Sequence, residues 1–242
     1  MESLKGKNTV VTGASSGFGK AIALACAREG ANVALLARRE ERLKEVAAQI
    51  EAKGQKAIIC PCDVGSETEI TAALQTIKTK LGQVDILVNN AGTNINARRI
   101  SETTLEEWQH LINVNLTSAF LFTKALLPEM IKQNQGTIIN IASRAASHPA
   151  LIAGVAYSSA KRGMEALTQI TNEEANPHNV RACVINPGAA NTPIMDLRPA
   201  PPSEEQRERM MQAEDIANTV VFVASLPQRV TLEAIEMRPT QS

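Results

Sequence analysis

The sequence predicts an α/β protein in which helices flank a doubly wound, mostly parallel sheet of seven strands. Short apolar segments alternate with longer segments of helical character, a rhythm typical of parallel strands joined by helical crossovers. A glycine-rich turn follows the first apolar segment, as it does in sheets of the Rossmann type. The length of 242 residues is one that a single α/β domain can reach, so we expect one domain over residues 1–242.

Composition and charge give no sign of a nucleic-acid or membrane partner. The 25 basic residues balance 25 acidic ones, and 44% of the residues are hydrophobic, near the norm for globular proteins. No apolar run approaches the ~20 residues of a membrane span, and the N-terminal segment lacks the apolar core of a signal peptide. We therefore expect a cytoplasmic protein. The four cysteines and three histidines lack metal-ligand spacing, so we expect reduced core cysteines and no metal.

The first strand is expected at 8–13, and the helix after it continues through 21–25 until Gly30 ends it. Between them, residues 12–19 read T-G-A-S-S-G-F-G. Glycines in such a turn let the backbone approach a pyrophosphate, whose charge then lies at the N-terminus of the helix. A plain corner between a strand and a helix does not need three glycines, so the turn indicates a dinucleotide site.

Two arginines follow the second expected strand, 31–37. Arg38 and Arg39 open the next helix, where positive charge opposes the helix dipole. Enzymes that prefer NAD commonly carry an acidic residue at the end of this strand, and this chain has none there. A 2′-phosphate would make the two cations favourable, although a solvated pair bonded to Glu40 or Glu41 is the alternative. We therefore favour NADP over NAD.

The alternation continues to the end of the chain. Sequences typical of capping boxes, at 66–69 and 104–107, start two helices, and the second helix is expected to carry Trp108 into the core. The other expected strands are 57–60, 84–88, 137–142, 180–185 and 231–237. The other expected helices are 41–52, 66 to about 82, a helix from 104, 113–130, 160–172 and 215–224.

The only tyrosine of the chain, Tyr157, opens the helix 160–172, and Lys161 follows one turn later. Side chains four residues apart share one face of a helix. An ammonium near a phenol favours the phenolate and lowers its pKa from about 10 toward neutral pH, as a proton donor to a developing alkoxide requires. The motif is short, and a half-buried tyrosine beside a solvated lysine would look the same.

The glycine turn at 12–19, the Y-S-S-A-K motif, Ser143 and Asn115 together resemble the short-chain dehydrogenase/reductase family, and the resemblance covers essentially the whole chain. It implies a catalytic set of Asn115, Ser143, Tyr157 and Lys161. In that set Ser143 and Tyr157 would bind the substrate oxygen, and Tyr157 would exchange the proton. Lys161 would lower the Tyr157 pKa and hold the nicotinamide ribose. Asn115 would open the helix backbone locally and hold a water that links Lys161 to solvent.

The resemblance also implies contacts to the cofactor. In the N-N-A-G sequence at 89–92, Asn89 would stabilise the central sheet and the small residues would leave room for a ribose. The dipeptide at 63–64 would contact adenine, and Thr192 would fix the nicotinamide carboxamide. The full set of expected cofactor-binding residues is Gly13, Ser15, Ser16, Gly17, Phe18, Gly19, Arg38, Arg39, Asp63, Val64, Asn90, Ala91, Gly92, Tyr157, Lys161, Pro187, Gly188 and Thr192.

Residues 193–211 are expected to form a variable segment that covers the substrate, with a polar helix at 204–211. Arg198 in this segment could meet an acidic substrate, but solvent exposure is the interpretation we favour. The chain ends with R-P-T-Q-S at 238–242. This ending resembles hydroxy-acid and serine-type dehydrogenases of the family, and it argues against a 3-oxoacyl substrate.

The resemblance implies an NADP(H)-dependent oxidoreductase that interconverts a carbonyl and a secondary alcohol of a small molecule. Two alternatives stay open: an NAD-dependent alcohol or hydroxy-acid dehydrogenase, and a non-catalytic NADP-binding sensor or scaffold. The presence of Ser143, Tyr157 and Lys161 favours an enzyme, because a sensor needs no proton donor. The resemblance further implies a homo-oligomer, a dimer or a tetramer, formed through the helices that carry Asn115 and Tyr157.

Overall fold

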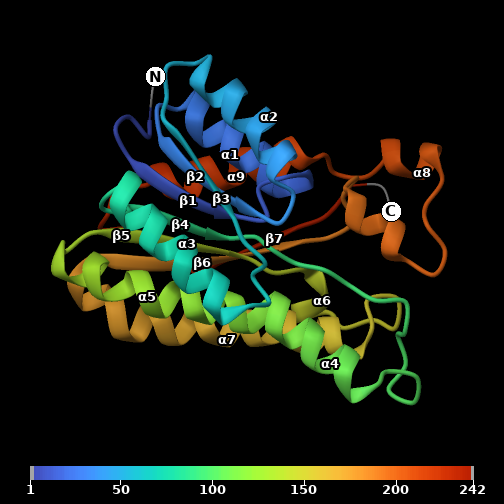
Figure 1. The fold of residues 1–242 in the computed structure, drawn as a ribbon. Helices are drawn as coiled ribbons and strands as arrows, with labels where there is room; N and C mark the ends of the chain where they lie inside the picture. Colours follow the sequence, from blue (N-terminus) through green and yellow to red (C-terminus); the bar gives the residue numbers. More distant parts are fainter. Residues whose placement is uncertain (1–2, 241–242) are drawn as a thin grey trace.

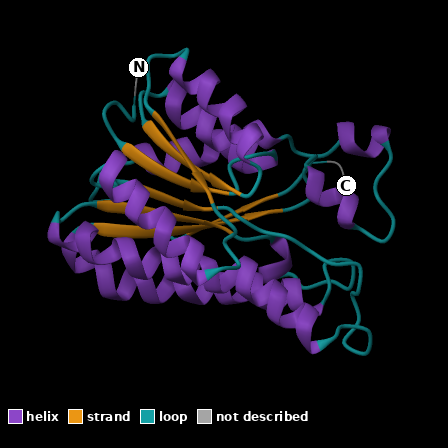
Figure 2. Ribbon diagram, in the orientation of Figure 1, coloured by secondary structure: helices purple, strands orange, loops and turns teal. Residues whose placement is uncertain are grey.

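A seven-stranded sheet forms the middle layer of the computed structural model, which describes residues 3–240 (Figure 1, Figure 2). The strand order is β3-β2-β1-β4-β5-β6-β7, and every pair of neighbours is parallel. The expected doubly wound sheet is thus parallel throughout. The chain reverses its winding between β1 and β4, and sheets of this kind bind ligands beyond the carboxyl ends of the strands at that point.

The expected alternation of strands and helices is present along the described chain. The strands are β1 (Asn8–Thr12), β2 (Asn32–Ala37), β3 (Ala57–Pro61), β4 (Ile86–Asn89), β5 (Gly136–Ile141), β6 (Val180–Pro187) and β7 (Ala234–Met237). The α-helices are α1 (Gly17–Arg28), α2 (Glu40–Glu51), α3 (Glu67–Lys80), α4 (Leu105–Ile112), α5 (Ser118–Lys132), α6 (Arg144–Ser147), α7 (Val155–Ala175), α8 (Glu204–Glu208) and α9 (Ala213–Ser225). A π-helical turn, η1 (Asn113–Thr117), and two 3₁₀ turns, η2 (Asn176–His178) and η3 (Pro193–Leu197), complete the set.

Both faces of the sheet are buried, so its central strands are continuous apolar runs. Successive residues of a strand point to opposite faces. Val10 and Leu36 pack toward α3 and α5. Val11 and Leu35 point to the other face and pack toward α1, α2 and α9. The two helical layers are visible on either side of the sheet (Figure 1). Burial of each such side chain contributes about 1.5–3 kcal/mol, which holds the strand ends rigidly beneath the site.

Several elements differ from the expected bounds. Strand β7 starts at Ala234 rather than 231, because pairing with β6 begins at Val184. Helix α8 ends at Glu208, before the segment returns to the site through a bridge between Ala190 and Met211. Helix α7 starts at Val155, two residues before Tyr157. Of the C-terminal segment 238–242, the last two residues lie outside the described chain.

Helix α4 lies at the rim of the molecule rather than over the sheet (Figure 1). Leu111 is its only buried residue, and Trp108 is partly exposed, so the prediction that Trp108 belongs to the core is wrong. The capping box at Thr104 and Glu107 is formed as expected. The helix therefore starts where the sequence indicates, but most of its apolar face does not pack against the core.

The helices α4, η1 and α5 join into one continuous helix, Leu105–Lys132, that is long and apolar enough to cross a membrane by length and composition. Its most apolar 18-residue window has a mean hydropathy of 1.2. The stretch is therefore longer than the sequence-based expectation of no run near the length of a membrane span. Phe122 and Met130 of α5 are fully buried in the core beneath the sheet. Core helices of globular proteins pass the same test, and 44% of the most apolar window is buried inside this protein.

Arg181 lies on β6 and is buried with no acidic partner among residues 3–240. Its guanidinium donates to the Thr137 hydroxyl and to five main-chain carbonyls that end α9 and follow it. These carbonyls belong to Val223, Ala224, Leu226, Pro227 and Val230. A cation at the C-terminus of a helix is favoured by the helix dipole and satisfies the last carbonyls. One side chain thus fixes the end of α9 to the sheet.

Candidate active site

A cavity of about 340 Å³ lies beyond the carboxyl ends of β1 to β5. Most of the residues expected to bind a cofactor line it. They are Gly13, Ser15, Ser16, Gly17, Phe18, Arg38, Arg39, Asp63, Val64, Asn90, Ala91, Gly92, Tyr157, Lys161 and Thr192. Gly19, Pro187 and Gly188 do not line this cavity. The fold thus collects residues from the connections that follow six strands, β1 to β6, around one opening.

The glycine turn is shaped by backbone geometry that other residues would not adopt. Gly13 and Gly17 have φ angles of +69° and +51°, in the left-handed region that side chains disfavour. A Cβ at Gly19 would overlap the carbonyl oxygen of Gly13. Ser16 caps α1 without a side-chain hydrogen bond to the helix, and the first turn of α1 carries no acidic residue. The N-terminus of α1 therefore presents its amides and its positive dipole to the cavity.

Thr12 holds the glycine turn against the connection after β4. Its hydroxyl oxygen accepts hydrogen bonds from the amides of Asn90 and Ala91, each at 2.9 Å, and its carbonyl accepts from Asn90 Nδ2 at 2.8 Å. Beneath them, Asn89 Nδ2 donates to Asn140 Oδ1 at 2.9 Å, a buried link between β4 and β5 that agrees with the expected role of Asn89. The two halves of the cavity wall are thereby fixed relative to each other.

Arg39 faces the cavity with no acidic partner among the described residues. Its Nη2 donates to the hydroxyls of Ser15 and Ser16 at 3.0 and 2.9 Å. Burial, and then the charges of Arg42 and Arg38, lower the Arg39 pKa. Serine hydroxyls do not neutralise a guanidinium, so this corner of the cavity favours an anion.

Arg38 is placed differently from Arg39. Both side chains are exposed, but no hydrogen bond joins Arg38 to the glycine turn in the described chain, and its Nη1 lies 3.9 Å from a carboxylate oxygen of Asp63. The Asp63 carboxylate also accepts a hydrogen bond from the Gly65 amide, and the Asp63 amide donates to Glu69. The capping box expected at 66–69 is therefore only half formed, because Glu69 reaches Asp63 instead of Ser66. Of the two arginines, Arg39 is the better candidate for binding a phosphate.

Thr192 shows that the cavity fits a polar ligand. Its side chain is buried, and its Oγ1 has no hydrogen-bond partner within residues 3–240. A buried hydroxyl without a partner costs free energy that a ligand amide or carbonyl would recover. Together with the amides of α1 and the cation of Arg39, this hydroxyl fits a phosphorylated dinucleotide.

Lys161 is buried beneath the cavity on the same face of α7 as Tyr157, as the spacing predicts. Its Nζ lies 5.7 Å from the centre of the Tyr157 ring and donates to the carbonyl oxygen of Ile141 at 2.8 Å. Burial lowers the Lys161 pKa to about 7. A substantial fraction of this amine is therefore uncharged at neutral pH.

The pKa of Tyr157 departs from the sequence-based prediction. Burial raises it, and a side-chain hydrogen bond with Ser143, followed by the charges of Arg98 and Arg198, acts in the opposite direction. The net shift is upward, and Lys161 does not contribute to lowering it. The physical reason is that burial of the phenol outweighs the hydrogen bond with Ser143 and the charges of the two arginines.

Asn115 lies in the π-helical turn η1, so the backbone does open locally there, as expected. Its Oδ1 accepts from the Thr93 amide at 3.1 Å, and its Nδ2 donates to the carbonyls of Thr93 and Leu111. A Cβ at Gly92 would lie 2.9 Å from Asn115 Oδ1 and 3.5 Å from Lys161 Nζ. The structure therefore brings Asn115 and Lys161 to the same side of Gly92, where a side chain at this position would otherwise lie. The water relay through them stays a prediction.

A second cavity, of about 420 Å³, adjoins the first and shares Tyr157 and Thr192 with it. Ser143 lines this second cavity and caps α6, its Oγ accepting from the Ala145 amide at 3.1 Å. Pro187 and Gly188 also line the second cavity rather than the first. The Tyr157 phenol thus stands where two cavities meet, one polar and suited to a dinucleotide, the other able to hold a second molecule.

Two arginines of the second cavity alter the sequence-based interpretation. Arg198 is half-buried in the cavity wall, so the expectation that it is solvent-exposed is wrong. Arg98 was not singled out, although it is buried in the same wall. The only signal was the pair Arg98-Arg99 in a loop, and sequence does not tell which of the two is buried. Arg99 is exposed and lies 3.6 Å from Glu102.

The family model for short chain dehydrogenases matches residues 7–201. An uncharacterized oxidoreductase of Staphylococcus epidermidis is 32% identical over 99% of this chain and 100% of its own, and one of Staphylococcus saprophyticus is 34% identical with the same coverage. Among solved structures, an alcohol dehydrogenase from Thermococcus sibiricus complexed with 5-hydroxy-NADP superposes with a TM-score of 0.87 at 30% identity, covering 98% of this chain and 97% of that one. A metagenomic short-chain oxidoreductase in complex with NADP gives 0.85 at 34% identity, covering 99% and 100%.

Proposed function

Because this chain belongs to the short-chain dehydrogenase family, we propose that it is an NADP(H)-dependent oxidoreductase that interconverts a carbonyl and a secondary alcohol of a small molecule. The observation that carries the proposal is the position of Tyr157, which lines both cavities. The first cavity suits a phosphorylated dinucleotide, and the second leaves room for a substrate beside Ser143. The two structural neighbours with NADP or its derivative support the choice of cofactor.

In the proposed reaction the nicotinamide, when bound, supplies or accepts a hydride at the substrate carbon. Ser143 and Tyr157 orient the carbonyl oxygen by hydrogen bonds and stabilise the negative charge that develops on it. Tyr157 transfers its phenolic proton to this oxygen during reduction, and takes the proton back during oxidation. Lys161 holds the nicotinamide ribose, and its amine lies near the Tyr157 ring. A water held at Asn115 links this amine to solvent, so that Tyr157 regains the proton that it gives to the substrate.

The remaining contacts of the cofactor follow from the cavity wall. The amides at the N-terminus of α1 hold the pyrophosphate, and Thr192 pairs its buried hydroxyl with the carboxamide. Asp63 and Val64 meet the adenine edge, while Ala91 and Gly92 leave space for a ribose. Purified protein should oxidise NADPH with at least one member of a panel of ketones and aldehydes, which is measured by the loss of NADPH absorbance. NADPH binding without any turnover would instead favour a sensor or scaffold.

Replacing Arg39 with alanine is expected to weaken NADPH binding roughly 10- to 100-fold, because a charge-assisted contact to the 2′-phosphate is lost. NADH lacks this phosphate, so its affinity should change little. The matched control is Arg38→Ala, which should have a smaller effect because Arg38 lies near Asp63, whereas Arg39 bonds to Ser15 and Ser16 in the cavity. Fluorescence titration of both cofactors measures two affinities for each variant and two for the unmodified protein. If the unmodified protein prefers NADH, the NAD-dependent alcohol or hydroxy-acid dehydrogenase replaces this proposal.

We also propose that the protein is a cytoplasmic homo-oligomer, and two exposed apolar faces support the assembly. Phe120 on α5 and Ile170 on α7 are 46% and 65% exposed. Phe222 on α9 is 55% exposed and lies on the other helical layer, near the open sheet edge at β7. Large exposed apolar side chains on two separate faces fit two kinds of symmetric interface between copies of this chain, which together generate a tetramer.

Light scattering after size exclusion is expected to give a tetramer for the unmodified protein. Introducing a charge in either face, as Ile170→Glu or Phe222→Glu, should yield dimers, because only one of the two interfaces is lost in each variant. Ile100→Glu is the control, since Ile100 is 81% exposed in a loop outside both faces. A monomeric unmodified protein at micromolar concentration would contradict the proposal.

A further inference from the structure

The wall of the second cavity is unusually cationic. Arg98, Arg144, Arg198 and His148 all line it, and none of the described residues lining it is acidic. Cations in a partly buried wall are unfavourable unless an anion pairs with them. Some of these four groups have an acidic partner within the protein. Those that have none would favour an anion bound in the cavity.

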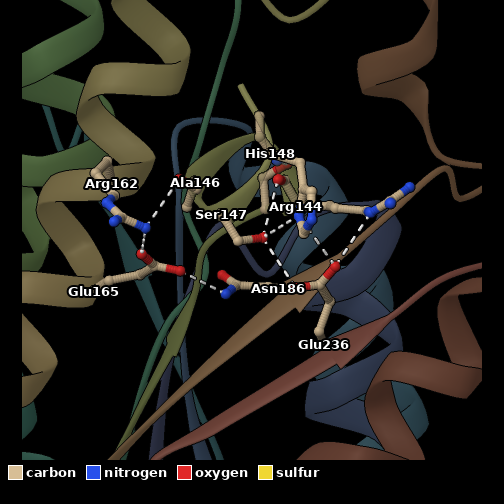
Figure 3. Close-up of polar contacts among 10 residues, drawn as sticks. Arg144, Ala146, Ser147, His148, Arg162, Glu165, Asn186 and Glu236 are labelled. Atoms are coloured by element: carbon tan, nitrogen blue, oxygen red, sulfur yellow. Dashed lines mark hydrogen bonds and ion pairs between the residues drawn. The ribbon is translucent and has the colours of Figure 1, made fainter. Parts of the chain in front are cut away.

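Glu236 of β7 neutralises two of the four (Figure 3). Its Oε1 lies 3.1 Å from Arg144 Nε and 3.4 Å from His148 Nδ1, and its Oε2 accepts from the Ser147 hydroxyl at 3.0 Å. These contacts, with a contribution from burial in the opposite direction, hold the Glu236 pKa below its ordinary value. Arg144 and His148 are therefore committed to a carboxylate of the protein.

Arg98 has no such carboxylate. It is only 6% exposed, its Nη1 and Nη2 donate to the carbonyls of Ala153 and Leu197, and its Nε has no hydrogen-bond partner within residues 3–240. Gly154, with φ of +87°, lets the loop approach so closely that a Cβ there would lie 3.0 Å from Arg98 Cδ. The loop and the covering segment are thus both built around this guanidinium.

Arg198 is the second cation without an acid among the described residues. The neighbouring carboxylate of Asp196 is bound to Arg207 at 2.5 Å instead. Burial, and then the charge of Arg207, lower the Arg198 pKa, and burial followed by the charge of Arg198 lowers that of Arg98. Both arginines are also within electrostatic reach of Tyr157. Two guanidinium groups that repel each other therefore stand beside the proton donor.

A purely structural role explains part of this arrangement. The bonds from Arg98 to Ala153 and Leu197 tie the loop 144–155 to the segment that covers the cavity. That role does not use the buried Nε, and it does not explain why Arg198 lies in the wall. A bound oxyanion explains both, because the guanidinium fork matches the two oxygens of a carboxylate.

We propose that Arg98 and Arg198 bind an oxyanion of the substrate while its carbonyl faces Ser143 and Tyr157, so that the substrate is an oxo acid and the product a hydroxy acid. This inference rests on the proposed function and assigns two specificity-determining residues to it. A phosphorylated ketone presents similar oxyanion chemistry and is distinguished by a separate arm of the experiment.

The test compares NADPH-dependent reduction of pyruvate, acetoacetate and levulinate with that of their methyl esters. These three acids place the carboxylate at increasing distance from the ketone, and each ester removes the charge and adds one methyl group. At least one acid should exceed its ester by roughly tenfold or more in kcat/KM, mainly through KM, as expected for a hydrogen bond to a charged group. Arg198→Gln and Arg98→Lys should abolish this preference. The matched control Arg99→Gln should retain it, because Arg99 is exposed beside Arg98.

Two outcomes of these assays would overturn the inference, and a third requires a binding measurement that decides it. Equal or better reduction of the esters by the unmodified protein would remove the oxyanion site and leave the proposed function intact. A preference confined to dihydroxyacetone phosphate over dihydroxyacetone would assign the site to a phosphate ester. If no carbonyl is reduced, the proposed function fails, and calorimetric titration of the acids and esters into the NADPH complex decides the site separately. Binding of an acid that Arg198→Gln abolishes supports it, and absence of binding overturns it.

Discussion

The variant Tyr157→Phe is expected to lose turnover by about 10³-fold and to bind NADPH nearly as well as the unmodified protein. A positioned general acid contributes about 10²–10⁴-fold. Of the two hydroxyl groups that line both cavities in the described chain, the phenol of Tyr157 is a far stronger acid than the alcohol of Thr192. Phenylalanine keeps the ring that packs against Lys161 and removes only the hydroxyl. The change should therefore appear in kcat rather than in cofactor affinity.

Steady-state rates and NADPH fluorescence titration measure the two parts of this prediction. Ser159→Ala is the matched control, because Ser159 is exposed on the same turn of α7 and its hydroxyl is remote from the cavities. Thermal unfolding should be similar for both variants, which excludes a loss of fold. If the phenylalanine variant keeps most of its turnover, the proton comes from another group and the role of Tyr157 is wrong.

The variant Lys161→Met is expected to be inactive and yet more stable than the unmodified protein below pH 7. Burial in the folded state lowers the Lys161 pKa from 10.5 to about 7. Below pH 7 the lysine is therefore charged in both the folded and the unfolded state, and the folded state is destabilised by the full cost of burying the charge. At about 1.4 kcal/mol per pKa unit this is on the order of 5 kcal/mol, offset in part by the lost bond to Ile141. Methionine fills similar volume without a charge.

The pH dependence of stability has the opposite sign to that of a lysine paired with an acid. Such a pair raises the lysine pKa, whereas burial lowers the pKa of Lys161. Between pH 7 and 10.5 the unfolded chain keeps the proton that the folded chain has released, so the stability of the unmodified protein rises with pH. The advantage of Lys161→Met should therefore shrink over this range and vanish above it. Urea unfolding at several pH values measures it, with Lys124→Met as the control at an exposed position of α5. A constant difference at all pH values would contradict the burial argument.

Features set by local chemistry could be predicted from the sequence. The glycine turn, the spacing of Tyr157 and Lys161 and the small residues at 89–92 each require particular residues at fixed offsets, and the structure places them around one cavity. The alternation of strands and helices is determined in the same local way. The resemblance to a known family added Asn115 and Ser143, whose sequence neighbourhoods alone would not distinguish them.

Features set by distant contacts could not be predicted. The burial of Arg98 depends on carbonyls of Ala153 and Leu197, which lie 55 and 99 residues further along the chain. The upward shift of the Tyr157 pKa depends on burial, which outweighs Ser143 and the charges of Arg98 and Arg198, and helical spacing reveals none of these surroundings. Trp108 is partly exposed because α4 lies at the rim of the molecule. In each case the sequence supplies the residue, and only the assembled fold supplies its surroundings.

The contacts of Arg181 bear on how the chain matures during synthesis. The cation enters the core as soon as β6 joins the sheet, and the carbonyls that solvate it belong to residues 223–230, close to the C-terminus. While those residues are still being added by the ribosome, a folded β6 would bury an unsolvated charge, which is strongly unfavourable. The C-terminal half of the sheet is therefore stable only once residues 223–230 have been added, and α1 likewise gains its contacts with α9 at that late stage.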